Sequence, residues 1–356
     1  MKKLIFVLAV SSLLASCGAS KKFQWTTVNV PEEGGISFVQ ITKEGSDVSG
    51  PRFYANGKGW YTGSSLSVSP DGQWVSYVAY KNKTHNIYLV NAHSSGSTVQ
   101  RTFRAGVNAA MFSPDGEDLV FAENRDDGQS VYITSAMGGN IIRQVAQGSY
   151  PAFSADGQKV FFSRYENSNT AGTGLLKKGT KIFTSTISYD NYSVWSYDRN
   201  SGQLTNYASG RNPRPLQGRN AFICERNSEN GYGEIWLVDI DNGSETLILS
   251  QPGKNFTTPS VSPDGQWIVF VANSSSNSKN VTVSTTRKIF AFDERKENTD
   301  IYAVRIDGTQ LTQLTYHKGN DCEPTWSPDG QFIYFISQRG TSDGSYNVWR
   351  MNFPLK

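Results

Sequence analysis

The sequence has few of the residues that carry most enzymatic and metal-binding chemistry. Its 356 residues include only 3 histidines, 3 cysteines and 4 methionines. The H-E-x-x-H, G-x-G-x-x-G and C-x-x-C patterns of zinc proteases, dinucleotide-binding folds and thiol–metal sites do not occur. The sequence therefore assigns no catalytic residue, no metal ligand and no cofactor.

An excess of charge of one sign is also lacking. The formal net charge is +3, and two of the 34 basic residues, Lys2 and Lys3, lie in a segment that we expect to be removed. The rest of the chain then carries 32 basic and 31 acidic side chains, with no basic run interleaved with aromatic residues. This balance argues against a nucleic-acid partner.

Only one apolar run is long enough to concern a membrane. Lys2 and Lys3 precede a mostly apolar run of 11 residues from Leu4 to Leu14, too short to span a bilayer and typical of a secretory signal. The following Leu14-Ala15-Ser16-Cys17-Gly18 resembles a bacterial lipobox, which implies cleavage before Cys17 and its acylation. We expect residues 1–16 to be a lipoprotein signal peptide and 17–35 a lipidated tether; the alternative is an ordinary signal peptide with a chance cysteine.

Two cysteines are left after Cys17, and they lie in different parts of the sequence. Cys224 belongs to the strand-like run Ala221-Phe222-Ile223-Cys224, whereas Cys322 begins another repeat unit. An even pair in an oxidising compartment can be bridged. Their separation instead predicts two free thiols, the first of them buried, and no disulfide.

The sequence is rich in a recurring turn signal. Ser-Pro-Asp-Gly begins at Ser69, Ser113, Ser262 and Ser327, and a degenerate copy, Ser-Ala-Asp-Gly, begins at Ser154. Proline presets φ for the first central position of a turn, and Asp and Gly suit the positions that follow. The residues on both sides alternate in polarity, so each of these tetrads predicts a β-hairpin.

A second marker sets the number of repeats. A β-branched residue followed by an aromatic ring recurs six times, with the ring at Tyr88, Tyr132, Trp195, Trp236, Tyr302 and Trp349. The steps of 44, 63, 41, 66 and 47 residues are near the period of four-stranded propeller blades, apart from two longer ones. Six copies predict six blades; the fourth has Gln217-Gly218-Arg219-Asn220 in place of the tetrad.

The sixth unit ends at Lys356 without a fourth strand, which would leave an open sheet edge. Near the N-terminus, the run Ile36 to Ile41 continues as Gln40-Ile41-Thr42, similar to Gln313-Leu314-Thr315 at the end of the fifth unit. We predict an all-β, six-bladed β-propeller over residues 36–356, closed by this N-terminal strand. The alternative is a stray N-terminal strand. In either case we expect an irregular, Gly-rich loop to follow it, through Gly63.

The two longer units each contain an insertion between their second and third strands. These insertions, residues 166–189 and 273–297, are polar and rich in Ser and Asn, as exposed loops are. Loops joining strands two and three share a face of a propeller with the loops between blades, so we predict that this face binds a partner. Its candidate residues are Arg104, Asn108, Tyr150, Arg211, Arg214, His317, Asp321 and Glu323.

The last repeat carries a family resemblance. Pro324-Thr325-Trp326-Ser327-Pro328-Asp329-Gly330, then Ile333-Tyr334-Phe335-Ile336-Ser337 and Val348-Trp349-Arg350-Met351, resembles the repeat of the TolB-family propeller over about Ser65 to Phe353. The resemblance implies a periplasmic, non-catalytic adaptor that docks envelope partners. The chain departs from that pattern in two ways: Gly18 to Ser65 is too short for the family's α/β domain, and Cys17 indicates acylation.

Two functions stay open from the sequence. The first is a monomeric, membrane-anchored envelope lipoprotein, held by acylated Cys17 to the outer membrane facing the periplasm, which binds a protein or a glycan through one propeller face. The alternative is a propeller enzyme, a carbohydrate lyase or hydrolase, with its site in the central cleft, because catalytic groups from different blades escape a motif search.

Overall fold

The architecture was obtained as a computed structural model. It describes residues 36–43, 47–50, 66–93, 98–104, 106–125, 128–137, 142–166, 192–229, 232–274, 299–341 and 344–355, and the backbone of five two-residue strands elsewhere. The predicted signal peptide, Cys17 and most of both insertions lie outside the described residues. Within the described part of the chain, no helix has the length and apolar character needed to cross a bilayer.

The tetrads form tight turns closed by their own side chains. In the first, Ser69 Oγ donates to Asp71 Oδ1 at 2.5 Å, and the N–H groups of Gln73 and Trp74 donate to Asp71 Oδ1 and Ser69 Oγ. The tetrads that begin at Ser113, Ser154, Ser262 and Ser327 repeat these bonds. Proline takes part in none of them, which explains why the degenerate copy works equally well.

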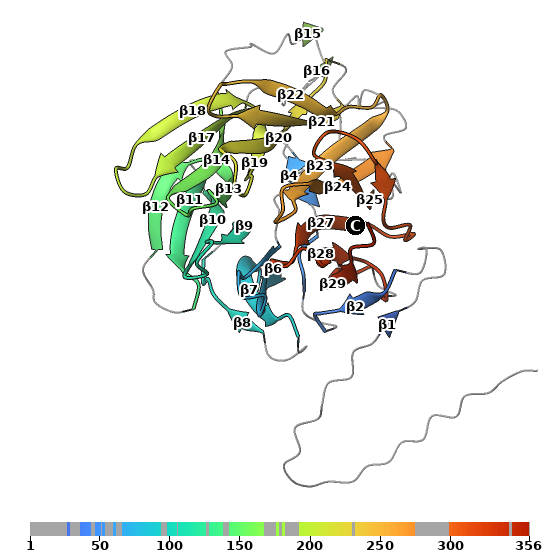
Figure 1. Cartoon of the computed structure of the whole chain (residues 1–356). Helices are drawn as coiled ribbons and strands as arrows, with labels where there is room; N and C mark the ends of the chain where they lie inside the picture. Colours follow the sequence, from blue (N-terminus) through green and yellow to red (C-terminus); the bar gives the residue numbers. More distant parts are fainter. Residues whose placement is uncertain are drawn as a thin grey trace, which may run out of the picture.

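The first three blades are four-stranded antiparallel sheets whose strands follow one another outward from the ring centre (Figure 1). Blade one consists of β5 (Ser67–Val68), β6 (Trp74–Lys81), β7 (Thr84–Asn91) and β8 (Val99–Gln100). Blade two consists of β9 (Val107–Phe112), β10 (Asp118–Arg125), β11 (Gly128–Ser135) and β12 (Ile142–Gln147). Blade three consists of β13 (Ser149–Phe153), β14 (Lys159–Tyr165), β17 (Tyr192–Asp198) and β18 (Leu204–Ser209).

The other three blades complete the predicted ring of six. Blade four consists of β19 (Arg211–Pro215), β20 (Ala221–Asn227), β21 (Gly233–Asp239) and β22 (Glu245–Leu249). Blade five consists of β23 (Lys254–Val261), β24 (Trp267–Ser274), β25 (Thr299–Arg305) and β26 (Thr312–Gln313). Blade six starts with β27 (Asp321–Trp326), β28 (Phe332–Ser337) and β29 (Asn347–Asn352). Two strand pairs lie outside the blades: β3 (Arg52–Phe53) with β4 (Trp60–Tyr61), and β15 (Leu176–Lys177) with β16 (Thr180–Lys181).

The aliphatic–aromatic pairs stand in the third strand of every blade, as predicted. The β-branched member is fully buried in all six: Ile87, Val131, Val194, Ile235, Ile301 and Val348. The ring beside it lies across a residue of the second strand, with ring centroids 5.9 Å apart for Tyr77 and Tyr88 and 5.5 Å apart for Phe121 and Tyr132. Each hydrophobic cluster joins residues of neighbouring blades, so the core is a series of layers between blades.

The ring is closed by the N-terminal segment, as predicted. β2 (Phe38–Gln40) pairs with β29 as the fourth strand of blade six, with Phe38 opposite Met351 and Gln40 opposite Trp349. A strand that the sequence did not predict, β1 (Thr27–Val28), pairs with the outer side of β2. The Arg339 guanidinium lies 3.9 Å from the centre of the Phe38 ring, so the closing strand is held by side chains as well as by its ladder.

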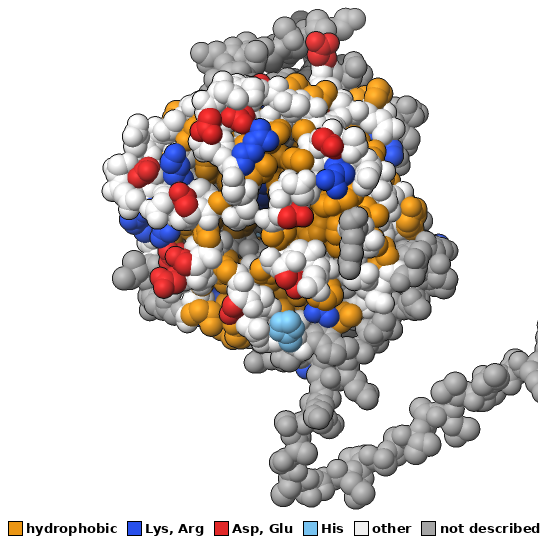
Figure 2. Space-filling view, in the orientation of Figure 1, with side chains coloured by type: hydrophobic (Ala, Val, Ile, Leu, Met, Phe, Trp, Pro, Cys, Tyr) orange, Lys and Arg blue, Asp and Glu red, His pale blue; other side chains and the backbone are white. Residues whose placement is uncertain are grey.

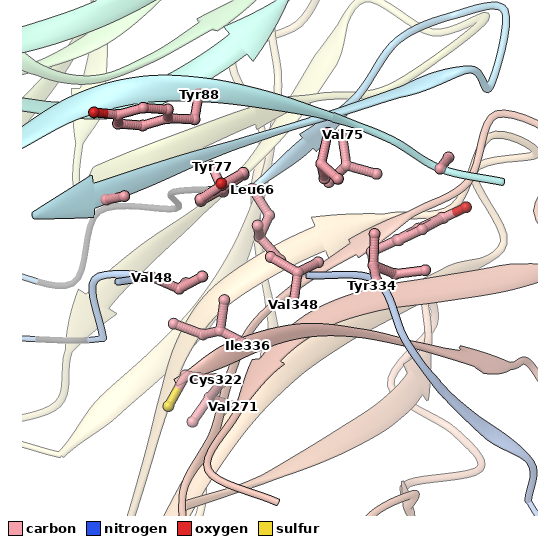
Figure 3. Close-up of a cluster of buried hydrophobic side chains, with 14 residues drawn as sticks. Val48, Leu66, Val75, Tyr77, Tyr88, Val271, Cys322, Tyr334, Ile336 and Val348 are labelled. Carbon is pink, nitrogen blue, oxygen red and sulfur yellow. The ribbon is translucent and has the colours of Figure 1, made fainter. Parts of the chain in front are cut away.

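The same segment also completes the inner side of blade one, where the sequence predicted only an irregular loop. β5 has two residues, and Asp47 to Ser49 extend it: Ser49 N–H donates to the Val78 carbonyl and Tyr80 N–H to the Asp47 carbonyl. Val48 bridges both Ala79 of blade one and Tyr346 of blade six. Figure 3 shows Val48 within the apolar cluster between these blades. One segment therefore contacts both sides of the junction between blades six and one, which we call the seam.

Candidate functional site

The ring has two faces that differ in their connections. We call crossover face the one that carries the links between second and third strands and between blades, including the Asn82-Lys83 turn and residues 102–104, 148, 210 and 315–318. The tetrad face carries the tetrad turns and the turns between third and fourth strands. Because the strands alternate in direction, every inner strand starts on the crossover face and ends on the tetrad face.

The inner strands of blades two to six share a backbone distortion near the crossover face. One residue in each has positive φ although it is not glycine: Ala109, Tyr150, Asn212, Thr258 and Glu323. The pairing register shifts at the same places, so each is a β-bulge. Proline follows in blades three to six, a position that bulges tolerate because no ladder donor is needed there. The recurrence makes this strain a property of the blade and not of one site.

A buried carboxylate ties two of these bulges together. Glu225 accepts hydrogen bonds from Arg211 Nε at 2.8 Å, from Asn212 Nδ2 at 2.7 Å and from the backbone N–H of Thr258 at 2.8 Å. Glu225 is 1% exposed and Arg211 7% exposed. The arrangement links blades four and five through a fully satisfied charge, which favours a structural role over recognition.

The structure buries six of the eight predicted recognition residues. Asn108, Tyr150, Arg211, Arg214, Asp321 and Glu323 are all less than 9% exposed. Asp321 bonds Arg339 at 2.6 Å, and Asn108 Nδ2 donates to Asn124 at 3.2 Å. Only Arg104 and His317 present appreciable surface; Arg104 is paired with Glu123 at 2.9 Å, and His317 Nδ1 accepts from Gly319 N–H at 3.0 Å.

The structure buries Arg214 among the inner strands, a position that the sequence did not predict. Its side chain starts from the inner strand of blade four, and Nη1 lies 3.5 Å from Met111 Sδ on the inner strand of blade two. Ala152 occupies the matching position of the intervening blade three. The guanidinium therefore passes the inner strand of blade three in front of a small residue and joins blade four to blade two.

Three consecutive links between blades are built on one frame, Gln-x-Thr followed by an exposed residue. Thr42, Thr102 and Thr315 accept the N–H of Val348, Ile87 and Ile301, each at 2.9 Å. The residues that follow, Lys43, Phe103 and Tyr316, point into solvent, with Phe103 81% exposed. The repeated Gln-x-Thr was visible in the sequence and could have identified these positions.

By contrast, the links from blade two to blade three and from blade three to blade four carry no projecting side chain. A single glycine, Gly148 or Gly210, joins one blade directly to the next. Their φ values of 155° and 134° lie in a region that side chains rarely adopt, and a Cβ would lie 2.5 Å from Phe162 Cδ2 or 2.8 Å from Cys224 Sγ. The crossover face therefore has one half with projecting side chains on the Gln-x-Thr frame, at the links after blades five, six and one, whereas the links after blades two and three lack such side chains.

Exposed aromatic side chains gather on the crossover face. Among the described residues, the aromatic side chains that are largely exposed are Tyr80, Phe103, Tyr165 and Tyr316, and all four lie at ends of strands on this face. Tyr165 packs edge-on to Tyr192 at the base of the blade-three insertion, with ring centroids 5.2 Å apart. Rings that are fixed and exposed are the usual anchors of recognition surfaces.

A groove of about 740 Å³ lies on the tetrad face between blades five and six. The aromatic rings along it are packed by the C-terminal residues: Phe353 meets Trp326 and Trp267 edge-on, at centroid distances of 4.6 and 5.3 Å. In Figure 2, acidic and basic side chains are scattered in small groups around a central hollow. No single sign of charge dominates the face in that view.

The two described cysteines are separate thiols, as predicted. Both are free and buried, in blades four and six. Burial raises the pKa of Cys224 to about 12, and burial also raises the pKa of Cys322. Thiols that stay protonated at neutral pH are poor nucleophiles and poor metal ligands.

Other catalytic signals are weak in the described part of the chain. No group of three His, Cys, Asp or Glu side chains there is placed to hold a metal ion. A Gly-x-Ser-x-Gly pattern occurs at 340–344, although Ser342 itself lies outside the described residues. It connects β28 and β29, two antiparallel strands, whereas the nucleophile elbow requires a strand followed by a helix.

Comparisons with known proteins agree with this architecture. The family model described as the TolB beta propeller domain matches residues 46–286. The Tol-Pal system protein TolB of Francisella tularensis subsp. mediasiatica is 24% identical over 207 residues, which cover 55% of this chain and 42% of that protein. The chain therefore matches less than half of the length of this relative.

Two solved structures illustrate the breadth of the fold. TolB from Acinetobacter baumannii aligns with a TM-score of 0.52 at 15% identity, over 81% of this chain and 63% of that one. An oligogalacturonate lyase in complex with manganese aligns with a TM-score of 0.52 at 14% identity, over 93% of this chain and 96% of that one. At such identities the likeness shows the fold alone.

Proposed function

Because the chain belongs to the TolB β-propeller family, we propose that it is a non-catalytic binding scaffold of the bacterial cell envelope. It holds a protein or glycan partner on the crossover face. Acylation of Cys17 tethers it to the outer membrane, facing the periplasm, as a monomer. The TolB proteins among its relatives belong to the Tol-Pal system, which supports an envelope partner.

One observation carries the choice of face. All four largely exposed aromatic side chains of the described residues, Tyr80, Phe103, Tyr165 and Tyr316, lie on the crossover face. Tyrosine and phenylalanine supply large contact areas with little loss of side-chain entropy, which suits them to anchor a partner. The two predicted insertions belong to the same face, and Tyr165 stands directly before one of them.

The burial of Arg211 and Arg214 changes the experiment that tests this function. Reversing either charge would break interior contacts and test folding. Suitable variants are a chain with both insertions shortened to the length of the blade-one connection, residues 81–86, and Tyr165→Ser. Met137→Ser is the matched control, because Met137 is 60% exposed on the tetrad face.

The measurement is crosslinked capture from an envelope extract, followed by mass spectrometry. We expect the unaltered protein and Met137→Ser to retain the same partner, and the other two variants to lose it while keeping their melting temperature. Capture that survives in both variants would exclude the crossover face. Release of an unsaturated product from oligogalacturonate by the purified protein would favour the lyase alternative instead.

The tether has its own test. Cys17→Ala should move the protein from the membrane to the soluble fraction and abolish labelling by radioactive palmitate. A wild-type protein that takes up no palmitate and fractionates as soluble would refute the lipid anchor.

A further inference from the structure

The half of the crossover face with projecting side chains carries cations beside aromatic rings. Lys43 follows the frame threonine between blades six and one, and Phe103-Arg104 and Tyr316-His317-Lys318 follow the other two. Lys43, Phe103, Tyr316 and Lys318 are all exposed. The Asn82-Lys83 turn of blade one adds Lys83, also exposed, between these links. We call Lys43, Lys83, Phe103, Tyr316 and Lys318 the lysine–aromatic arc.

The outward position of Phe103 is enforced by its neighbours. Asn86 is 3% exposed, and its Oδ1 accepts from Thr102 Oγ1 at 3.0 Å and from Arg104 N–H at 2.9 Å. Asn86 Nδ2 in turn donates to Thr84 Oγ1 at 3.0 Å, which joins this link to the Lys83 hairpin. Because the Thr102 hydroxyl and the Arg104 N–H are both held by buried Asn86, the Phe103 ring between them is directed away from the core.

The Lys83 backbone is also unusual. Lys83 has φ of 65° and Asn82 φ of 51°, the two positive values of a two-residue hairpin turn in which glycine is preferred at the second position. A lysine there accepts a conformational cost and projects its ammonium beyond the strand ends. Backbone strain of this kind points to a use of the side chain.

The closing strands place the N-terminal tether on the same side. β2 runs toward the crossover face, because Ile41 N–H donates to the carbonyl of Val348, the second residue of β29. β1 is antiparallel to β2, with Thr27 opposite Val39 and Val28 opposite Phe38, so it starts at the crossover end. The ten Cα–Cα steps from Cys17 to Thr27 span at most about 35 Å, which brings this face within range of a membrane that holds the proposed anchor.

We propose that the lysine–aromatic arc docks on an anionic phospholipid surface, with the ammonium groups of Lys43, Lys83 and Lys318 against headgroup phosphates and the rings of Phe103 and Tyr316 in the interface. Lysines beside exposed rings have the composition of peripheral membrane-binding surfaces. Asp47 is the exposed acid that we find next to the arc among the described residues. Docking by the arc tilts the ring and leaves the insertion-bearing edge of blade three free for a partner.

The test uses the full mature chain with Cys17→Ala, so that no acyl group contributes. Co-sedimentation is measured with vesicles of phosphatidylethanolamine and phosphatidylglycerol and with vesicles of phosphatidylcholine alone. We expect binding to the anionic vesicles only, weakening as salt is raised. Each lysine reversed in the arc should weaken the partition coefficient at least about fivefold.

The variants are Lys43→Glu with Lys318→Glu, and Phe103→Ser. Their matched controls on the tetrad face are Lys159→Glu with Arg219→Glu, and Met137→Ser, which alter the same charge and a similar apolar surface. Arc variants that bind like the unaltered chain, equal binding to neutral vesicles, or no binding to any vesicle would each overturn the proposal. This proposal rests on the proposed tether, which brings the arc close to a membrane. Failure of the arc and failure of the proposed partner site can be told apart, because shortened insertions should abolish partner capture and leave vesicle binding intact.

Discussion

At the scale of single residues, Glu225 gathers several interior polar contacts on one buried carboxylate. One carboxylate receives a guanidinium, an amide and a backbone N–H from the inner strands of two blades. Both charges are out of water, so each depends on the other. A recognition surface does not need a buried ion pair that links two blades. A ring whose core is divided into separate layers between blades does need such links.

Glu225→Ala should lower the free energy of unfolding by about 3–5 kcal/mol, because it leaves the Arg211 charge buried without its carboxylate. Guanidinium or urea denaturation measures the change. Glu229→Ala, an exposed carboxylate after the same strand, should stay close to the unaltered protein. A similar stability for the two variants would show that the Arg211 charge is accommodated in another way.

At Lys83, in contrast to Glu225, we expect a substitution to stabilise the protein. Lys83→Gly removes a side chain from a left-handed backbone position and should raise the free energy of unfolding by about 1 kcal/mol. Thermal melting measures it, and Lys81→Gly, at the last residue of strand β6, should destabilise instead. If the vesicle experiment succeeds, the stabilised variant should also bind anionic vesicles less well, since stability and membrane contact then compete at this position. A lower melting temperature for Lys83→Gly would contradict the account of the turn.

At the scale of elements, the tetrad turns make stability depend on pH. Hydrogen bonds from serine hydroxyls hold the pKa of Asp71, Asp115 and Asp156 below the ordinary value. A folded-state pKa that is lowered adds stability above the unfolded pKa, near 4, and this contribution disappears as pH falls through the folded value.

The triple variant with Asn at positions 71, 115 and 156 should therefore lose stability at pH 7 and show a flatter decline between about pH 4 and pH 2. Urea denaturation at a series of pH values measures both. The exposed Glu117→Gln serves as the control. Parallel stability profiles for the triple variant and the unaltered chain would mean that the turn carboxylates contribute nothing to acid unfolding.

The elements also show which features the sequence could supply. The tetrads and the aliphatic–aromatic pairs are local patterns, and each blade is folded from contiguous residues, so six blades could be counted directly. Even the closure of the ring by the N-terminal strand could be predicted from the sequence. Thr42 accepts a backbone hydrogen bond in blade six as Thr315 does in blade five, within the same short pattern. The extension of β5 by Asp47 to Ser49 could not be predicted from the sequence. Those residues have no periodic pattern, and they pair with residues that lie further along the chain.

The candidate site was predicted less well, for a physical reason. Residues at the start of an inner strand look like loop residues in sequence, but neighbouring blades converge there and cover them. Arg211 and Asp321 therefore became interior ion pairs. Phe103 was passed over because an apolar residue in a sequence is expected to be inside, and only the bonds of Asn86 to both of its neighbours show why it is not.

At the scale of the whole molecule, the seam between blades six and one should govern stability. A chain beginning at Lys43 lacks β1 and β2, exposes the β29 edge and removes Phe38 from beneath Arg339. We expect a lower melting temperature and aggregation, measured by calorimetry and size-exclusion chromatography.

Phe38→Ala separates lost packing from a lost strand. It should cost about 3–5 kcal/mol while the ladder stays intact. Val39→Ala, on the half-buried side of the same strand, is the milder control. A Lys43-start chain that melts and elutes like the mature protein would show that the seam does not hold the ring.

The seam also has a consequence for how the protein is made. Thr42 bonds Val348, 306 positions further along the chain, so a segment that is synthesised early waits for one that is synthesised much later. At about 5–20 residues per second that wait is roughly 15–60 s, during which the closing strand β2 has no β29 to pair with. A chain interrupted before β29 has five complete blades and no closed ring, and its unpaired N-terminal strand distinguishes it from a finished molecule for any chaperone or protease that reads exposed β-edges.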